Sequence, residues 1–109
     1  MANWDFDKVF DALEIRDTDS HESGHVYIGE FNAETLVIYN ETDQTVTLKY
    51  QGSVDDTSWI DIGSDIVIAA GVKDYETVTD FFPEYRLLAQ CASAPTTGSL
   101  SVWVMKAGG

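Results

Sequence analysis

The residues best suited to chemistry stand near the start of the chain, where His21 and His25 lie among acids in the stretch DTDSHESGH. Two histidines four residues apart can bind one metal ion from a single face of a helix. Here Ser23 and Gly24 interrupt helical spacing, so that geometry is not expected. The alternating oxygens also resemble the start of a calcium loop, but the turn glycine and the final bidentate glutamate are missing. We interpret the stretch as a solvated acidic turn and expect no metal and no cofactor.

No other group of residues predicts catalysis. Nineteen acids face six lysines and arginines, so close pairs of carboxylates are expected by chance. The single cysteine, Cys91, lies in YRLLAQCAS, where we expect a small buried core residue, because no histidine is placed to activate the thiol. The sequence shows neither a nucleophile–base pair nor a glycine-rich phosphate loop. We therefore predict that the protein is not an enzyme and has no catalytic residues.

Aromatic and apolar side chains are better candidates for function. In SLSVWVMK, residues 99–106, strand alternation places leucine and two valines on one face and directs Trp103 and Met105 to the other. An apolar pair on the outer face of a sheet is more typical of an interface than of a solvated surface. Other strand aromatics could stack on sugar rings, although we expect core packing for Tyr50 and most of the rest.

The first segment carries five large apolar residues, Trp4, Phe6, Val9, Phe10 and Leu13. Four of them follow the i, i+3, i+4, i+7 spacing of one face of a helix, and an extended arm is the alternative. The downstream strands already supply enough alternating residues to fill a sandwich. We therefore expect this segment to contact a partner, and these five residues with Trp103 and Met105 form the predicted interface.

The elements that must position these residues are strands. Short alternating or apolar runs are separated by turn residues and have no helix between them; they cover 25–31, 35–40, 46–54, 58–63, 65–71, 74–81, 85–92 and 99–106, and 13–18 is a candidate edge strand. This pattern predicts an all-β protein, a single antiparallel, jelly-roll-like β-sandwich of seven or eight strands. Residues 46–71 are expected to form a hairpin that turns at Asp55 and Asp56. We assign residues 1–18 to an N-terminal arm or short helix leading into the first strand, and residues 19–109 to the sandwich domain.

The formal net charge of −13 limits the partners. Such a surface repels phosphate backbones and anionic headgroups, so neither nucleic-acid nor membrane binding is expected. No apolar run approaches the length of a membrane span, and the first residues lack the basic start and apolar core of a signal peptide. We expect the protein to be made and folded in a cytoplasm.

The stretch VIYNETDQTVTLKYQGSVDDTSWIDIGSDIVIAAG and the later YRLLAQCASAPTTGSLSVWV together resemble small β-sandwich structural proteins of tailed bacteriophages and related viruses. The likeness in strand order covers roughly residues 25–105. It implies a virion component, such as a capsid decoration protein, a vertex-spike base, or a tail or connector subunit. Its expected partners are other virion proteins and further copies of itself, and its expected location is the virion, after folding in the host cytoplasm.

A carbohydrate-binding adhesion module is the alternative function. It would need Trp59 or several tyrosines exposed along a groove, and its partner would be a host-surface glycan. Whether those rings are buried, part of an interface or exposed distinguishes the two functions.

Overall fold

The computed structural model describes residues 3–27, 33–78 and 82–108, except for the side chains of residues 3 and 4. Within these ranges the chain forms the strands β1 (Asn3–Leu13), β2 (His21–Glu22), β3 (Val26–Tyr27), β4 (Ala33–Asn40), β5 (Val46–Ser53), β6 (Ile60–Asp61), β7 (Ile66–Ile68), β8 (Lys73–Val78), β9 (Glu84–Gln90) and β10 (Leu100–Gly108). The described ranges contain no helix long and apolar enough to cross a membrane.

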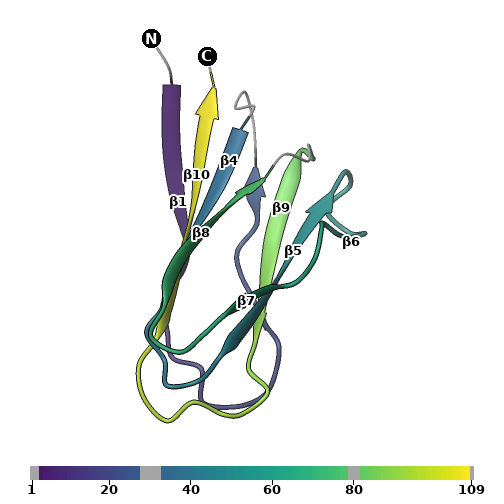
Figure 1. The fold of residues 1–109 in the computed structure, drawn as a ribbon. Coiled ribbons are helices and arrows are strands. Elements are labelled where there is room, and N and C mark those ends of the chain that lie inside the picture. The colour runs from purple at the N-terminus through teal and green to yellow at the C-terminus, as the bar shows by residue number, and fades with distance from the viewer. Residues whose placement is uncertain (1–2, 28–32, 79–81, 109) are drawn as a thin grey trace.

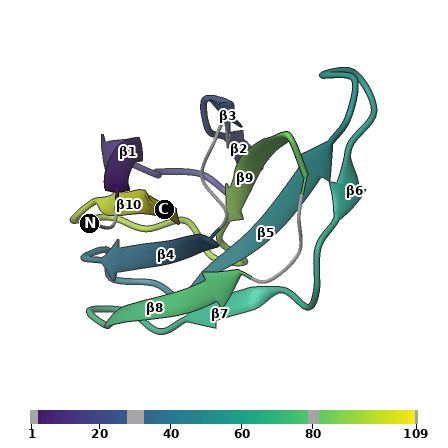
Figure 2. The same cartoon turned by 90° about the horizontal axis from the view of Figure 1, so that it is seen from above.

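The strands form two antiparallel sheets that face each other (Figures 1 and 2). One sheet has the order β1-β10-β4-β8 and the other has the order β2-β9-β5-β6. Because β3 also pairs with β9, and β7 also pairs with β5, the short strands β2/β3 and β6/β7 act as two interrupted strands. The ten strands then occupy eight positions, ordered 1-8-3-6 and 2-7-4-5, which is the arrangement of a jelly roll. The predicted all-β sandwich is confirmed.

The helical alternative for the N-terminal segment is wrong, because β1 is an extended strand paired with β10. Its register shifts between Lys8 and Phe10, and again between Phe10 and Leu13. Such bulges insert an extra residue, which moves the following side chains to the opposite face. Phe6 therefore points outward and Phe10 points inward. In a regular strand, two residues that are four positions apart would lie on the same face. The four-residue spacing that resembles a helix comes from a bulged strand.

The turn after β1 also differs from the prediction. No strand covers residues 14–18, and the chain instead crosses to the second sheet, with Ile15 fully buried on the way. The left-handed backbone of Ala12, φ 50°, lies where the strand ends. Of the predicted strands at 25–31 and 74–81, residues 28–31 and 79–81 lie outside the described part of the chain.

The predicted hairpin over residues 46–71 is confirmed, since β5 pairs with both β6 and β7. At its turn the Asp55 carboxylate accepts hydrogen bonds from the backbone N–H groups of Ser58 and Thr57, at 2.8 and 3.0 Å. These bonds stabilise the ionised form and lower the pKa of Asp55 to about 2. Asp56 follows in the left-handed region, with φ 63°.

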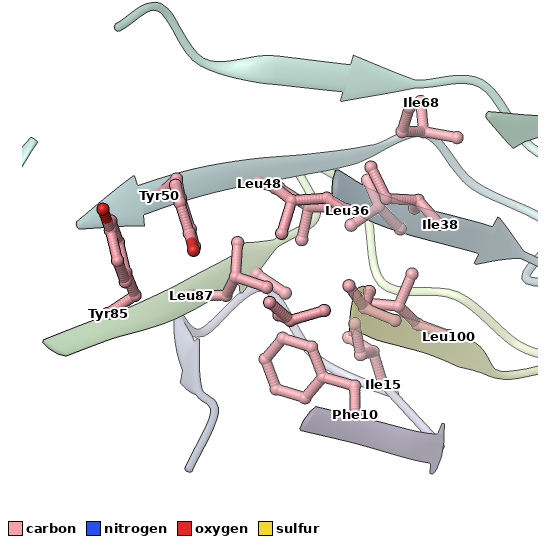
Figure 3. Close-up of a cluster of buried hydrophobic side chains, with 14 of the residues drawn as sticks. Phe10, Ile15, Leu36, Ile38, Leu48, Tyr50, Ile68, Tyr85, Leu87 and Leu100 are labelled. Atoms are coloured by element: carbon pink, nitrogen blue, oxygen red, sulfur yellow. The ribbon is translucent and has the colours of Figure 1, made fainter. Parts of the chain in front are cut away.

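The core lies between the inner faces of the two sheets (Figure 3). Leu36 on β4 and Leu48 on β5 are fully buried there. Burial of each such side chain contributes about 1.5–3 kcal/mol. The predicted core position of Cys91 is confirmed, with 1% of the residue exposed. Tyr50, also expected in the core, stacks on Tyr85 with ring centroids 4.9 Å apart.

One end of this interior is polar. Glu34 on β4 and Lys106 on β10 are buried cross-strand neighbours, and Lys106 forms an ion pair with Asp7 at 3.0 Å. The Tyr50 hydroxyl donates to Oε2 of Glu34 at 3.2 Å, whereas Oε1 of Glu34 has no hydrogen-bond partner among the described residues. Burial raises the pKa of Glu34 to about 7, although hydrogen bonds from Tyr50 and Tyr85 and the charge of Lys106 oppose the shift.

Candidate functional site

The outer side of the β1-β10-β4-β8 sheet carries a cluster of apolar side chains that we call the apolar face: Phe6, Val37, Tyr39, Trp103 and Met105. These residues line a shallow hollow of about 240 Å³. Phe6 is 52% exposed and Met105 is 41% exposed, whereas Trp103 is half-buried. Exposed apolar surface of this kind marks interaction sites in folded proteins.

Strand register gathers these residues from three strands. Met105 on β10 lies opposite Phe6 on β1, and Trp103 on β10 lies opposite Val37 on β4. Because alternate residues of a strand share a face, Trp103 and Met105 are neighbours on the outer side. The Tyr39 ring meets the Trp103 indole edge to face, with centroids 4.8 Å apart. The outward direction predicted for Trp103 and Met105 agrees with this arrangement.

Two lysines border the apolar face. The ammonium group of Lys8 lies 4.7 Å from the centroid of the Trp103 ring, and that of Lys73 lies 4.7 Å from the centroid of Tyr39. Both contacts are cation–π interactions, and Lys8 also forms an ion pair with Asp11 at 2.8 Å. The surface is therefore an apolar centre with cationic edges, on a protein whose net charge is strongly negative.

The remaining residues of the predicted interface do not join this face. Phe10 is 5% exposed and belongs to the core of its own domain, and Val9 and Leu13 pack against that core. Their expected contact with a partner is therefore corrected: β1 uses these residues to hold its own sandwich together. The side chain of Trp4 lies outside the described part of the structure.

The outer side of the second sheet is polar. Arg86 on β9 pairs with Glu22 and donates to Oε1 of Gln51 at 2.7 Å. Gln51 in turn donates to Asp61 at 2.7 Å, and Lys49 pairs with Asp65 at 2.9 Å. This network, which we call the polar face, pairs its own charges, while Ile60 and Val67 of the same sheet expose single apolar side chains beside it.

The two histidines do not act together. His21 contacts Asp17 at 2.8 Å, which lowers the pKa of Asp17 chiefly through this hydrogen bond. His25 contacts Asp56 at 2.7 Å, and Glu84 lies beside this second pair. Desolvation raises the pKa of Glu84, and its hydrogen bond and charge interaction with Asp56 raise it further. Sequence reasoning missed this second cluster, because Asp56 and Glu84 stand 31 and 59 positions after His25 in the chain.

Trp59, the residue on which the carbohydrate-binding alternative depends, contacts side chains of its own chain. Its indole is half-buried and lies 4.8 Å from the His25 ring, measured between centroids. The guanidinium of Arg86 covers it at 4.4 Å from the ring centroid. Tyr50 is buried in the core, whereas Tyr27 and Tyr75 are exposed on strands of different sheets.

Comparison with known proteins places the fold among small β-rich proteins. Residues 28–107 match the sequence model of a family described as "Domain of unknown function (DUF6385)". No curated protein sequence matches the chain. The SPBc2 prophage-derived protein YomS has a similar structure at 12% identity, with a TM-score of 0.70 over 99% of this chain and 96% of that one.

Two further structures share the fold. The PBSX exported protein XepA is 18% identical with a TM-score of 0.66, over 94% of this chain and 36% of XepA, so this chain spans about a third of that protein's length. A structure from the Bacillus endospore appendages, described as a novel family of disulfide-linked pili, is 12% identical with a TM-score of 0.61, over 97% of this chain and 85% of that chain. The predicted resemblance to β-sandwich proteins of phage origin is confirmed at the level of fold.

Proposed function

The chain belongs to the family described as "Domain of unknown function (DUF6385)", and we propose that it is a structural protein of a virus particle or a related prophage-encoded assembly. It works through protein–protein contacts rather than catalysis. Within a particle of a tailed virus, the position is that of a capsid decoration protein, a vertex-spike base, or a tail or connector subunit. The prophage origin of YomS supports this proposal, as does the use of a similar sandwich in the endospore appendage pili.

The contrast between the two outer surfaces carries the proposal. On the polar face, charged side chains pair with one another and remain hydrated. On the apolar face, Phe6 and Met105 expose hydrophobic surface that water does not solvate favourably. The apolar side chains on this face are gathered into one cluster of five residues, and a sandwich gains free energy by covering such a cluster against another subunit.

We propose that further copies of the chain and other virion proteins cover this face. Aromatic and methionine side chains are enriched at the centres of protein interfaces, and Trp103, Tyr39, Phe6 and Met105 provide such a centre. The acidic remainder of the surface, with its net charge of −13, disfavours nucleic acid and membranes as partners.

The carbohydrate-binding alternative has weaker support. Sugar hydroxyls require hydrogen-bonding side chains beside the stacking ring, since an unpaired polar group loses free energy when it is buried. Three of the five residues that line the hollow, Phe6, Val37 and Met105, offer no such groups, which leaves only the Tyr39 hydroxyl and the Trp103 indole N–H in the lining. The other candidate, Trp59, packs against His25 and Arg86 of its own chain.

The substitution Met105→Lys tests the apolar face. It places a charge at the centre of the proposed contact, at a position already exposed, so the fold should tolerate it. Val67→Lys is the matched control, because Val67 is a 64% exposed strand residue on β7 in the other sheet. We expect the unmodified chain and Val67→Lys to self-associate as concentration rises in sedimentation velocity experiments, and Met105→Lys to remain monomeric with a similar melting temperature. Equal association of all three proteins would contradict the proposed surface.

Particle association needs its own test. Particles from the source organism can be purified by density gradient, and the chain quantified in them by mass spectrometry. We expect the chain in the particle fraction at a constant ratio to the main shell protein. A chain found only in the unassembled fraction would show that it is not a virion component.

A further inference from the structure

We propose that His25, Asp56 and Glu84 form a binding site for a divalent transition-metal ion, for which Zn²⁺ is the appropriate probe. One imidazole nitrogen and one carboxylate oxygen from each acid lie within 4.8 Å of one another. Nδ1 of His25 lies 2.7 Å from Oδ1 of Asp56. Ligand atoms around a tetrahedral zinc ion with bonds of about 2.1 Å lie about 3.4 Å apart. Side-chain rotations that change these separations by about 1 Å bring the three ligands to coordination distance.

Sheet topology creates this arrangement. Glu84 is the first residue of β9, which runs between β3 and β5 at this end of the sheet. Its cross-strand neighbours are Tyr27 on β3 and Ser53 on β5. His25 stands immediately before β3, and Asp56 lies in the turn that follows β5. Three chain segments that are distant in sequence thus deliver one ligand each to the same place.

The set of donors selects the class of ion. Calcium and magnesium prefer sites built from oxygen ligands alone. Imidazole nitrogen together with carboxylate oxygen suits zinc and neighbouring first-row metals. Three protein ligands leave at least one position for water or for a group from a partner.

A second observation points to a ligand at this place. Oε2 of Glu84 is buried and has no hydrogen-bond partner among the described residues. A buried carboxylate oxygen without a donor is unfavourable, and a cation bound by the Glu84 carboxylate would satisfy it. Asp55 adds further negative charge, and with burial and Asp56 it raises the pKa of Glu84. Several carboxylate charges would therefore stabilise a bound cation.

Neighbouring side chains hold the histidine in place. The Trp59 indole packs against the His25 ring at 4.8 Å between centroids, and Arg86 lies over the indole. Arg86 is itself held by Gln51 and Glu22. Partners outside the coordination sphere that orient a ligand raise the affinity of a metal site, because less side-chain freedom is lost on binding.

Calorimetric titration of the full chain with zinc chloride tests the proposal. We expect one zinc ion per chain and a rise in melting temperature when zinc is added. His25→Gln, Asp56→Asn and Glu84→Gln should each weaken binding at least about tenfold. Asn tolerates the left-handed backbone of residue 56, so Asp56→Asn removes the charge while preserving the turn. The melting temperature of each variant without zinc checks that it is folded.

His21→Gln is the matched control. His21 contacts Asp17 at 2.8 Å, much as His25 contacts Asp56. Of the two histidines, however, only His25 belongs to the group of three possible metal ligands found among the described residues. This variant should bind zinc as tightly as the unmodified chain. Equal loss in His21→Gln and His25→Gln, or no zinc binding at millimolar concentration, would overturn the proposal. Tighter binding of calcium than of zinc would also overturn it, because imidazole would then not be a ligand.

Discussion

Replacing Glu34 by glutamine is expected to change the pH dependence of stability. The folded chain holds the pKa of Glu34 at about 7, compared with 4.5 for a solvated glutamate. Below pH 4.5 this carboxyl is protonated in both the folded and the unfolded chain, so it adds no pH dependence to the free energy of unfolding. Between pH 4.5 and 7 the unfolded chain loses the proton while the folded chain keeps it. The free energy of unfolding therefore falls as pH rises through this window.

The size of this loss follows from the two pKa values. At about 1.4 kcal/mol for each pH unit, the difference between the folded pKa of about 7 and the unfolded pKa of 4.5 corresponds to a loss of roughly 3 kcal/mol in the free energy of unfolding. Glu34→Gln removes the titrating group and the loss with it. At low pH the variant should be less stable by about 1 kcal/mol, since the new amide N–H group takes the place of Oε1, which has no partner among the described residues. At pH 8 the variant should be more stable than the unmodified chain by about 2 kcal/mol.

Urea unfolding followed by tryptophan fluorescence from pH 4 to pH 8 measures this effect. For a domain of this size, 3 kcal/mol moves the urea midpoint by about 1–3 M. Glu76→Gln is the control, because it removes one exposed acid from β8 of the same sheet and so corrects for the general loss of charge. If the difference between Glu34→Gln and the unmodified chain does not vary with pH, or varies as it does for Glu76→Gln, the reasoning about Glu34 is refuted.

Three further predictions concern the fold. Gly98→Ala should lower the free energy of unfolding, measured by chemical denaturation, by about 2 kcal/mol or more, because the new Cβ would lie 1.8 Å from the Glu41 carbonyl oxygen and the backbone φ is +82°. Gly24→Ala is the control and should be nearly neutral, since nothing lies near its Cβ. Deletion of residues 1–13 removes β1 and the buried Phe10 ring, so the free energy of unfolding should fall by at least about 3 kcal/mol. An unchanged melting temperature would show that β1 does not hold the sandwich together. Added salt should raise the melting temperature between 10 mM and 0.5 M, because ions screen the repulsion among nineteen acids, with a screening length of about 10 Å at 0.1 M. A flat or falling curve would contradict this.

The strands and the outward apolar residues follow from local pattern. Alternation over residues 46–53 predicts β5 and its buried Leu48, because side chains of a strand point to opposite faces in turn. The same rule directs Trp103 and Met105 outward on β10. Turn residues such as Asp55 mark the hairpin for an equally local reason, since their side chains bond to backbone N–H groups only a few positions away.

Only the tertiary structure decided the rest. The bulges of β1 reverse the facing of Phe10, and nothing in the residue types specifies where a strand takes up an extra residue. Burial of Glu34 depends on β4 lying beside β10 and across from Tyr50, so its raised pKa is a property of the packed sheets. The cluster of His25, Asp56 and Glu84 arises because β9 runs between β3 and β5. Strand pairing brings distant residues together through backbone hydrogen bonds, whose partners a single sequence does not encode locally.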